Sequence, residues 1–176
     1  SSFFGDGASK HLDDVIRAKG RKLGQPLQYE IGPSTDIVIV YFDDGPKTFS
    51  LYTCPVTEWH YFYALIPIQH LRNDSELQPR SLRQESMWGL YRHFQRNTQL
   101  APSICRLDGQ GQGILLLFDG QHKAAAQIWA GRQAVECKIY ISPESKRLKE
   151  TNLEAHQSYR QMSFYSSELM KKYADI

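Results

Sequence analysis

The strongest hydrophobic pattern in the chain is a run of five large apolar residues, Ile114 to Phe118. Such a run is too short for a lone helix and is typical of a strand that is buried on both faces. The run ends at Asp119-Gly120, and the ten residues that follow have high helix propensity and end before Gly131. The pattern therefore predicts a strand, a tight turn and a helix in succession.

Other segments rich in β-branched and aromatic residues predict further strands. Five of them precede the central strand and one follows it: Leu27 to Ile31, Asp36 to Phe42, Thr48 to Thr53, Trp59 to Ile68, Ala101 to Leu107 and Ala134 to Ile141. The last segment alternates, so we expect Val135, Cys137, Ile139 and Ile141 to face the core. The glycine-rich residues 108–113 are expected to form a hairpin turn into the central strand.

Helical periodicity predicts helices at Ala8 to Leu23 and at Ser81 to Asn97, the second with a capping box between Ser81 and Gln84. Two more are expected after Ser142-Pro143-Glu144, the second over residues 159–173. Together the elements predict an α+β fold in which a mixed sheet is flanked by helices. Three parts are expected: an N-terminal helix with a β-meander (1–58), a core (59–142) and C-terminal helices (143–176).

The turn after the central strand carries groups that suit an anion. The first turn of a helix presents unpaired N–H groups and the positive end of the helix dipole. Gly120 permits close approach of a ligand, and Gln121, His122 and Lys123 supply hydrogen-bond donors. Asp119 is placed to cap the helix or to hold a cation. The pattern predicts a phosphate-binding corner, but an Asp cap beside a solvated Lys is also common at ordinary strand-to-helix turns.

Three motifs between about Phe62 and Ile141 resemble the ParB/sulfiredoxin superfamily. Ala64-Leu65-Ile66-Pro67-Ile68, followed by Leu77-Gln78-Pro79-Arg80, is similar to the "IPI" strand and "QPR" loop of ParB. Leu115 to Lys123, with Ala126, is similar to the superfamily's strand-Gly-x-x-Arg-x-x-Ala phosphate motif. In its fuller form, Asp119-Gly120-Gln121-His122-Lys123 most resembles the DGQHR or DGQQR box of DndB-type proteins and of NTPase domains in phage-defence restriction systems.

The resemblance implies a ParB/sulfiredoxin-like fold and a role for each matched residue. Residues 120–123 would hold phosphates, with Lys123 in the place of the superfamily's arginine, and Arg80 would approach from the neighbouring loop. Asp119 would reach a nucleotide-bound Mg²⁺, and Asp119, His122 and Glu85 are the candidates for catalysis. The candidate site residues are Gln78, Arg80, Glu85, Asp119, Gly120, Gln121, His122 and Lys123.

Two residues differ from the superfamily's pattern. Gln121 replaces the cysteine of sulfiredoxin, which excludes sulfinic-acid reduction through that nucleophile. Lys123 replaces the arginine, which keeps the positive charge but loses the planar fork that grips a phosphate with two hydrogen bonds. By the same resemblance, Asn152, His156, Gln157 and Arg160 are candidates to complete the pocket, the alternative being a hydrated helix face.

The leading functional hypothesis is an NTP-binding module, and a candidate NTP hydrolase, in a DNA-associated system such as phage defence, DNA modification control or partition. Its expected cofactor is Mg²⁺ with a nucleoside triphosphate. Expected partners are the nucleotide and DNA or a DNA-associated protein, with a homodimer as a further option. The alternatives are a DndB-like DNA-binding regulator without turnover and a ParB-like nuclease.

Composition adds three constraints. Residues 59–142 hold nine Lys and Arg against six Asp and Glu, a net charge of +3 in a chain whose net charge is +2, so the positive segment is the one that carries the motif. The three cysteines form no C-x-x-C pair and are expected to be free thiols of a cytoplasmic protein. Neither a long apolar run nor a signal-peptide pattern indicates a membrane or secreted protein, and the helical pattern at the C-terminus suggests the front part of a longer protein.

Two groups of residues are candidates for contact with nucleic acid, each with a structural alternative. The aromatic residues Trp59, Tyr61, Phe62 and Tyr63 are able to stack nucleobases, although a place in the core is favoured for them. Arg83, Arg92, His93 and Arg96 form either a DNA-backbone stripe or, by preference, a solvated helix face.

Overall fold

The computed structural model describes residues 2–156. The chain divides into two units, Ser1–Ser142 and Pro143–Ile176, each of which is described by itself. In the second unit, residues 145–156 are helical, as the Ser-Pro-Glu start predicts, and include Asn152 and His156. The helix expected over 159–173, with Gln157 and Arg160, lies outside the described residues.

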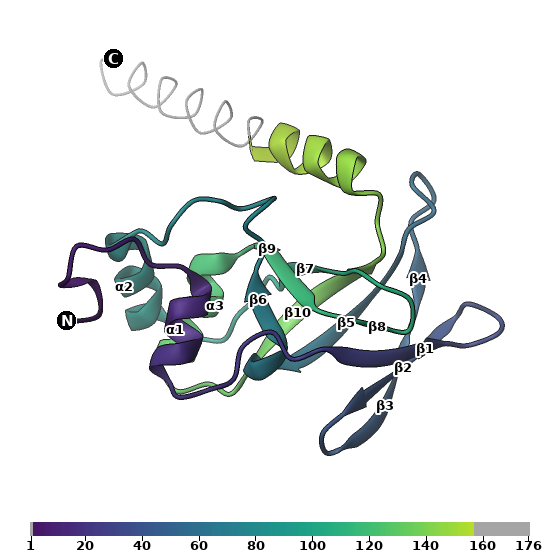
Figure 1. Cartoon of the computed structure of the whole chain (residues 1–176), viewed down its shortest axis with the longest axis horizontal. Helices are drawn as coiled ribbons and strands as arrows, with labels where there is room; N and C mark the ends of the chain where they lie inside the picture. Colours follow the sequence, from purple (N-terminus) through teal and green to yellow (C-terminus); the bar gives the residue numbers. More distant parts are fainter. Residues whose placement is uncertain (1, 157–176) are drawn as a thin grey trace, which may run out of the picture. The chain divides into compact units, whose positions relative to one another are not determined.

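A six-stranded mixed sheet forms the centre of the first unit, with strand order β4-β5-β10-β7-β9-β6 (Figure 1). Its strands are β4 (Tyr52–Thr53), β5 (His60–Pro67), β6 (Leu71–Asn73), β7 (Ser103–Leu107), β9 (Leu115–Asp119) and β10 (Ala134–Ile141). β10 runs parallel to β7 and β6 parallel to β9, whereas the other neighbours are antiparallel. The predicted mixed sheet is therefore confirmed, and so are the four buried positions of β10.

A second sheet of four strands has the order β3-β2-β1-β8. Its strands are β1 (Leu27–Ile31), β2 (Ile37–Phe42), β3 (Gly45–Ser50) and β8 (Gln112–Gly113). The predicted strand from Thr48 to Thr53 is wrong, because β3 ends at Ser50 and β4 pairs with β5 of the other sheet. Leu51, only 6% exposed, lies where the chain passes from one sheet to the other.

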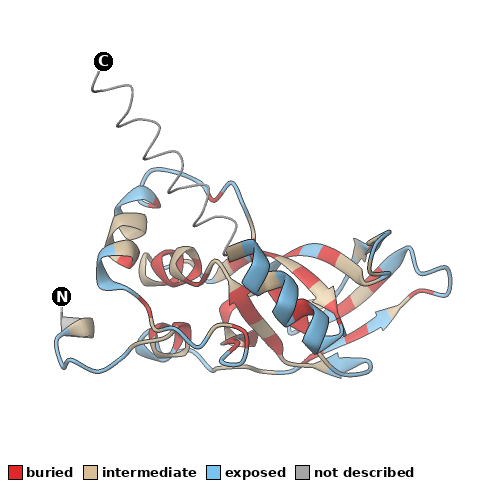
Figure 2. Ribbon diagram, turned by 90° about the horizontal axis from the view of Figure 1, so that it is seen from above, coloured by how far each residue is buried: buried red, intermediate tan, exposed pale blue. Residues whose placement is uncertain are grey.

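Three helices belong to this unit: α1 (Leu12–Ala18), α2 (Gln84–His93) and α3 (Gln121–Trp129), besides the short 3₁₀ turns η1 (Ser2–Phe4) and η2 (Ile68–His70). α3 contacts α1, α2, β7 and β10. Its residues Ala124, Ala125 and Ala126 have no exposed surface, and their small size lets the helix lie close to the sheet. Figure 2 shows the buried residues on the strands and on the helix faces turned toward them. The predicted α+β fold, a mixed sheet flanked by helices, is confirmed.

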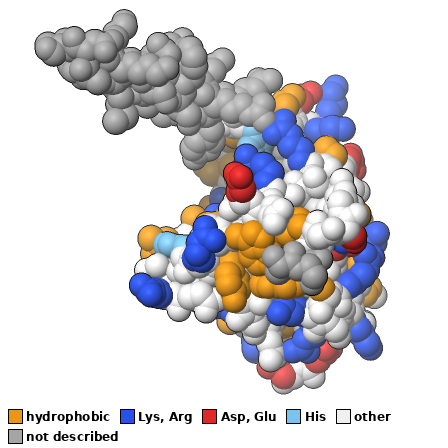
Figure 3. All heavy atoms as spheres, turned by 90° about the vertical axis from the view of Figure 1, so that its left-hand side faces the viewer, with side chains coloured by type: hydrophobic (Ala, Val, Ile, Leu, Met, Phe, Trp, Pro, Cys, Tyr) orange, Lys and Arg blue, Asp and Glu red, His pale blue; other side chains and the backbone are white. Residues whose placement is uncertain are grey.

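Aromatic residues join the helices to the N-terminal turn. The ring of Phe3 lies 4.9 Å from that of Trp129, and Phe4 and Trp129 each lie 5.8 Å from Trp88. The Lys19 ammonium lies 4.6 Å from the Trp129 ring. Figure 3, which faces this side of the molecule, shows hydrophobic side chains gathered at its centre with Lys and Arg around them.

Both α1 and α2 are shorter than predicted, and for α2 the cause is tertiary. The residue before α2 is Arg83, whose backbone is extended and whose side chain forms no cap, so the capping box between Ser81 and Gln84 is wrong. The Leu82 amide donates to the carbonyl of Lys10 at 2.7 Å, and the Arg83 amide donates to His122 Nε2 at 2.8 Å. These hydrogen bonds hold residues 82–83 out of the helix.

Candidate functional site

The predicted strand, turn and helix are confirmed as β9, Gly120 and α3. Gly120 has φ +80° and ψ 30°, a left-handed conformation that favours glycine. A Cβ at this position would lie 2.8 Å from Lys123 Cε, 3.0 Å from Ser103 Oγ and 3.3 Å from Ser103 Cα. Glycine therefore allows β7 to lie directly against the turn.

The N-terminus of α3 has no cap from a side chain and no acidic residue in its first turn. The predicted capping role of Asp119 is wrong, because Gly120 occupies the N-cap position. The first amides of α3 have no partner within the helix, and nothing in its first turn offsets the positive end of its dipole. This end of α3 therefore favours an anion.

Lys123 adds a positive charge to the same corner. Its Nζ donates a hydrogen bond to the carbonyl of Ala101 at 3.3 Å, just before β7. Ser103 Oγ donates to the carbonyl of Gly120 at 3.2 Å and ties the start of β7 to the turn. An ammonium group has three N–H donors, so two donors of Lys123 are left for a ligand.

Gln121 contributes an unsatisfied polar atom. Its side chain is only 5% exposed, and its Nε2 donates to the carbonyl of Arg80 at 3.4 Å. Its Oε1 is buried and has no hydrogen-bond partner among the residues that the structure describes. Buried polar atoms are nearly always paired, so this acceptor points to a donor from outside the chain, such as a ligand or water.

His122 connects the corner to the segment before α2. Its Nε2 accepts the hydrogen bond from the Arg83 amide, which places the proton of the neutral ring on Nδ1. Burial, followed by the positive charge of Arg83, lowers the pKa of His122 below its ordinary value of 6.5. A neutral imidazole therefore holds residue 83 against α3.

The pKa of His122 predicts a pH dependence of stability. Because the native ring resists protonation and the unfolded one does not, the free energy of unfolding should fall as pH drops below about 6.5, until the folded pKa is passed. His122→Gln keeps an acceptor that does not titrate and is the control. Thermal unfolding at about pH 7.5 and about pH 5.5 should show a larger loss for the wild type than for this variant. Equal losses of stability in the wild type and in His122→Gln would show that His122 does not cause the pH dependence.

The structure brings only some of the predicted site residues together. Arg80 reaches the corner through its carbonyl, while its side chain is exposed. The side chains of Gln78 and Glu85 form no hydrogen bond or ion pair with the corner in the described part of the chain, and Glu85 is exposed. Within residues 2–156, no three His, Cys, Asp or Glu side chains form a metal-binding group. A Mg²⁺ ion beside Asp119 would therefore take further oxygen ligands from phosphate and water.

Asp74 and Arg106 were not singled out in the sequence, yet they position the loop that leads to Arg80. Arg106 Nε and Nη2 donate to the two carboxylate oxygens of Asp74 at 2.6 and 3.0 Å, and the side chains are 4% and 1% exposed. The Asp74 amide donates to the carbonyl of Leu117 in β9 at 2.9 Å. In the sequence, the only indication of a role for Asp74 is that residues 70–80 are mostly polar.

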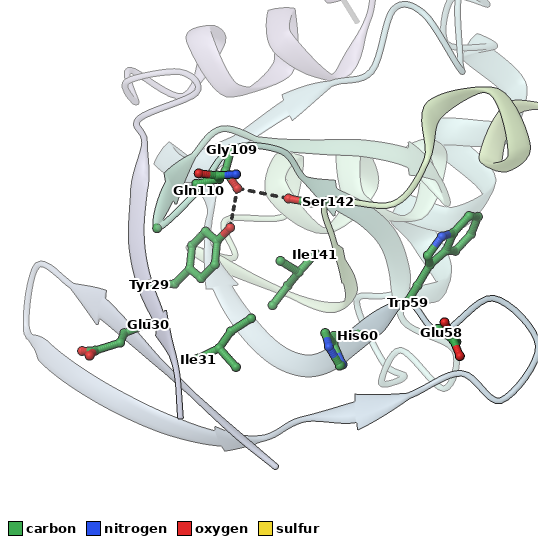
Figure 4. A pocket seen from close by; sticks show the side chains of 11 residues that line it. Tyr29, Glu30, Ile31, Glu58, Trp59, His60, Gly109, Gln110, Ile141 and Ser142 are labelled. Carbon is green, nitrogen blue, oxygen red and sulfur yellow. Dashed lines mark hydrogen bonds between the residues drawn. The ribbon is translucent and has the colours of Figure 1, made fainter. Parts of the chain in front are cut away.

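A separate pocket of about 590 Å³ lies between β1, β5 and the end of β10 (Figure 4). Ile31, Trp59 and Ile141 line it, and the hydroxyls of Tyr29 and Ser142 both donate to the carbonyl of Gly109. None of the predicted site residues lines this pocket.

No family model matches the chain, and no curated protein matches it. The structure is similar to the crystal structure of sulfiredoxin from Arabidopsis thaliana, with a TM-score of 0.40 and 20% identity over 52% of this chain and 96% of that chain. None of the described helices is long and apolar enough to span a membrane.

Proposed function

We propose that residues 120–123 bind the phosphates of a nucleoside triphosphate, in an NTP-binding module of a DNA-associated system. The observation that carries the proposal is the uncapped N-terminus of α3, whose first amides have no partner within the helix and can donate to an anion. The Lys123 ammonium, with two donors left, supplies the counter-charge on the same turn.

Hydrolysis is the second part of the proposal. Phosphoryl transfer asks an enzyme mainly to position the phosphates and to neutralise their charge. Lys123 would do so from α3, and the exposed Arg80 side chain would approach from the loop that Asp74 anchors. Bound Mg²⁺ would neutralise further charge. Asp119, whose carboxylate forms no hydrogen bond or ion pair in the described part of the chain, would hold the ion or a water.

Binding of ATP, CTP and GTP with MgCl₂, measured by titration calorimetry, tests the first part. Lys123→Ala should weaken binding at least about tenfold, because a charge-assisted hydrogen bond contributes about 1.5–3 kcal/mol. Lys47→Ala, which removes an exposed lysine of β3, should bind like the wild type. If no triphosphate binds the wild type, or if Lys123→Ala binds equally well, the proposal is wrong.

Release of inorganic phosphate from the bound nucleotide separates the two parts. Turnover that is lost in Lys123→Ala would support an NTP hydrolase. Tight binding without release would support the alternative, a DNA-binding regulator without turnover. For that alternative, Arg83, Arg92, His93 and Arg96 are all exposed, as a stripe that contacts a DNA backbone requires.

A further inference from the structure

The outer face of the six-stranded sheet carries tyrosines in place of the usual polar residues. Tyr61 and Tyr63 of β5 lie opposite Tyr140 and Lys138 of β10, and Tyr52 of β4 lies opposite Tyr61. Successive side chains of a strand point to opposite faces. Because Phe62 and Ile139 between them are fully buried, the tyrosines and Lys138 project away from the core. The sequence pattern favours a place in the core for these aromatic residues, and for Tyr61 and Tyr63 that prediction is wrong.

These rings touch one another and form one surface, here called the aromatic face: Tyr52, Trp59, Tyr61, Tyr63 and Tyr140. Tyr61 lies 5.5 Å from both Tyr52 and Tyr140, and Trp59 lies 6.0 Å from Tyr140. Tyr52 and Tyr63 are each 48% exposed. Clustered exposed aromatic residues of this kind mark interaction surfaces.

A single cation lies at the centre of the aromatic face. Lys138 Nζ is 4.6 Å from the ring centre of Tyr61, 5.0 Å from that of Tyr140 and 6.0 Å from that of Tyr63. The rings themselves carry no carboxylate. Glu136 lies on the same side of β10, two residues before Lys138 and opposite Leu65, but among the described residues it forms no ion pair with Lys138, whose ammonium contacts the rings. The positive charge at the centre therefore complements an anionic partner.

We propose that the aromatic face binds single-stranded nucleic acid, with bases stacked on the rings and phosphates beside the Lys138 ammonium. Every nucleobase has a π-face, so stacking on such rings tolerates any sequence, whereas a duplex keeps its base faces covered. Tyrosine is also enriched at protein interfaces, but an ammonium at the centre of the rings that forms no ion pair with a described carboxylate favours a polyanion. The aromatic face lies on β4, β5, β10 and Trp59 just before β5, apart from the turn between β9 and α3, so this inference does not depend on the proposed nucleotide site.

Fluorescence anisotropy with a labelled DNA or RNA strand of about 12 nucleotides, without nucleotide or Mg²⁺, tests this proposal. Tyr63→Ala should weaken binding roughly 5- to 150-fold, and Tyr63→Phe, which keeps the ring, should stay within about twofold of the wild type. Lys138→Ala should weaken binding and reduce the salt dependence by about one phosphate contact, a slope change of about 0.7. Tyr41→Ala, which removes an exposed tyrosine of β2, is the matched control and should bind like the wild type.

Three results would overturn the proposal: no saturable binding by the wild type, equal binding by Tyr63→Ala and the wild type, or tighter binding of a duplex than of either strand. A dimer in sedimentation that Tyr63→Ala dissociates, without any strand binding, would assign the aromatic face to a second copy of the chain and also overturn it. Lys123→Ala should bind the strand like the wild type, so failure of the nucleotide site would leave this result unchanged. Circular dichroism of each variant confirms that it is folded, and Tyr52→Ala on the edge strand provides a second ring variant.

Discussion

Replacing Asp74 by alanine is expected to lower the free energy of unfolding by about 3–5 kcal/mol, the usual cost of leaving one partner of a buried ion pair alone. Arg106 is only 4% exposed and would keep its charge without the two hydrogen bonds that it donates to Asp74. Its remaining carboxylate partners, Glu76 and Asp108, are 55% and 46% exposed, so solvent screens their attraction. Urea unfolding of the two proteins measures the difference.

Glu76→Gln is the matched control for this prediction. Glu76 also contacts Arg106, at 3.2 Å, but its exposure limits the expected loss to less than about 1 kcal/mol. A loss below about 1 kcal/mol in Asp74→Ala as well would show that the buried pair does not hold residues 74–80 in place.

Replacing Gly120 by alanine is expected to cost about 1–3 kcal/mol in stability and to weaken nucleotide binding. Part of the cost is the left-handed backbone at φ +80°, which an L side chain adopts only with strain. The rest comes from the new Cβ, which would lie 2.8 Å from Lys123 Cε and 3.0 Å from Ser103 Oγ, and would displace the Lys123 side chain and push β7 away from the turn. Thermal unfolding measures the first effect and titration calorimetry the second.

Gly131→Ala separates strain from contact. Gly131 follows α3 with φ +98°, but a Cβ there would meet nothing within 4 Å. This variant should lose stability through strain alone and bind nucleotide like the wild type. Wild-type affinity in Gly120→Ala would show that the close approach of β7 to the turn does not shape the phosphate site.

The sequence predicts elements well where the local pattern alone determines them. β10 has the predicted bounds, Ala134–Ile141, because every second residue is apolar and the neighbouring sheet positions bury them. β9 follows from a long apolar run. α3 follows from a stretch of helix-forming residues that lies between two glycines, Gly120 and Gly131. The start of α2 was not predictable, because hydrogen bonds from Leu82 and Arg83 to residues far away in the sequence decide it.

The same distinction applies to the candidate site. Gly120 to Lys123 are contiguous, so their common position at one turn follows from the sequence. Their partners, Arg83 and Ser103, come from other elements. Asp74 and Arg106 are 32 positions apart in the sequence, which leaves no local signal of their ion pair. The outward direction of Tyr63 was not predictable either, because alternation in an aromatic-rich strand does not show which of its faces is buried.

Amide chemical shifts in ¹⁵N–¹H spectra test the central claim most directly, since they report the first turn of α3 itself. The labelled chain would be titrated with ATP, CTP and GTP, each with MgCl₂. The account predicts that the largest saturable shifts belong to the amides of Gln121, His122 and Lys123, and that Lys123→Ala loses them. Shifts centred on other elements, or none with any of the nucleotides, would contradict a phosphate site at this corner.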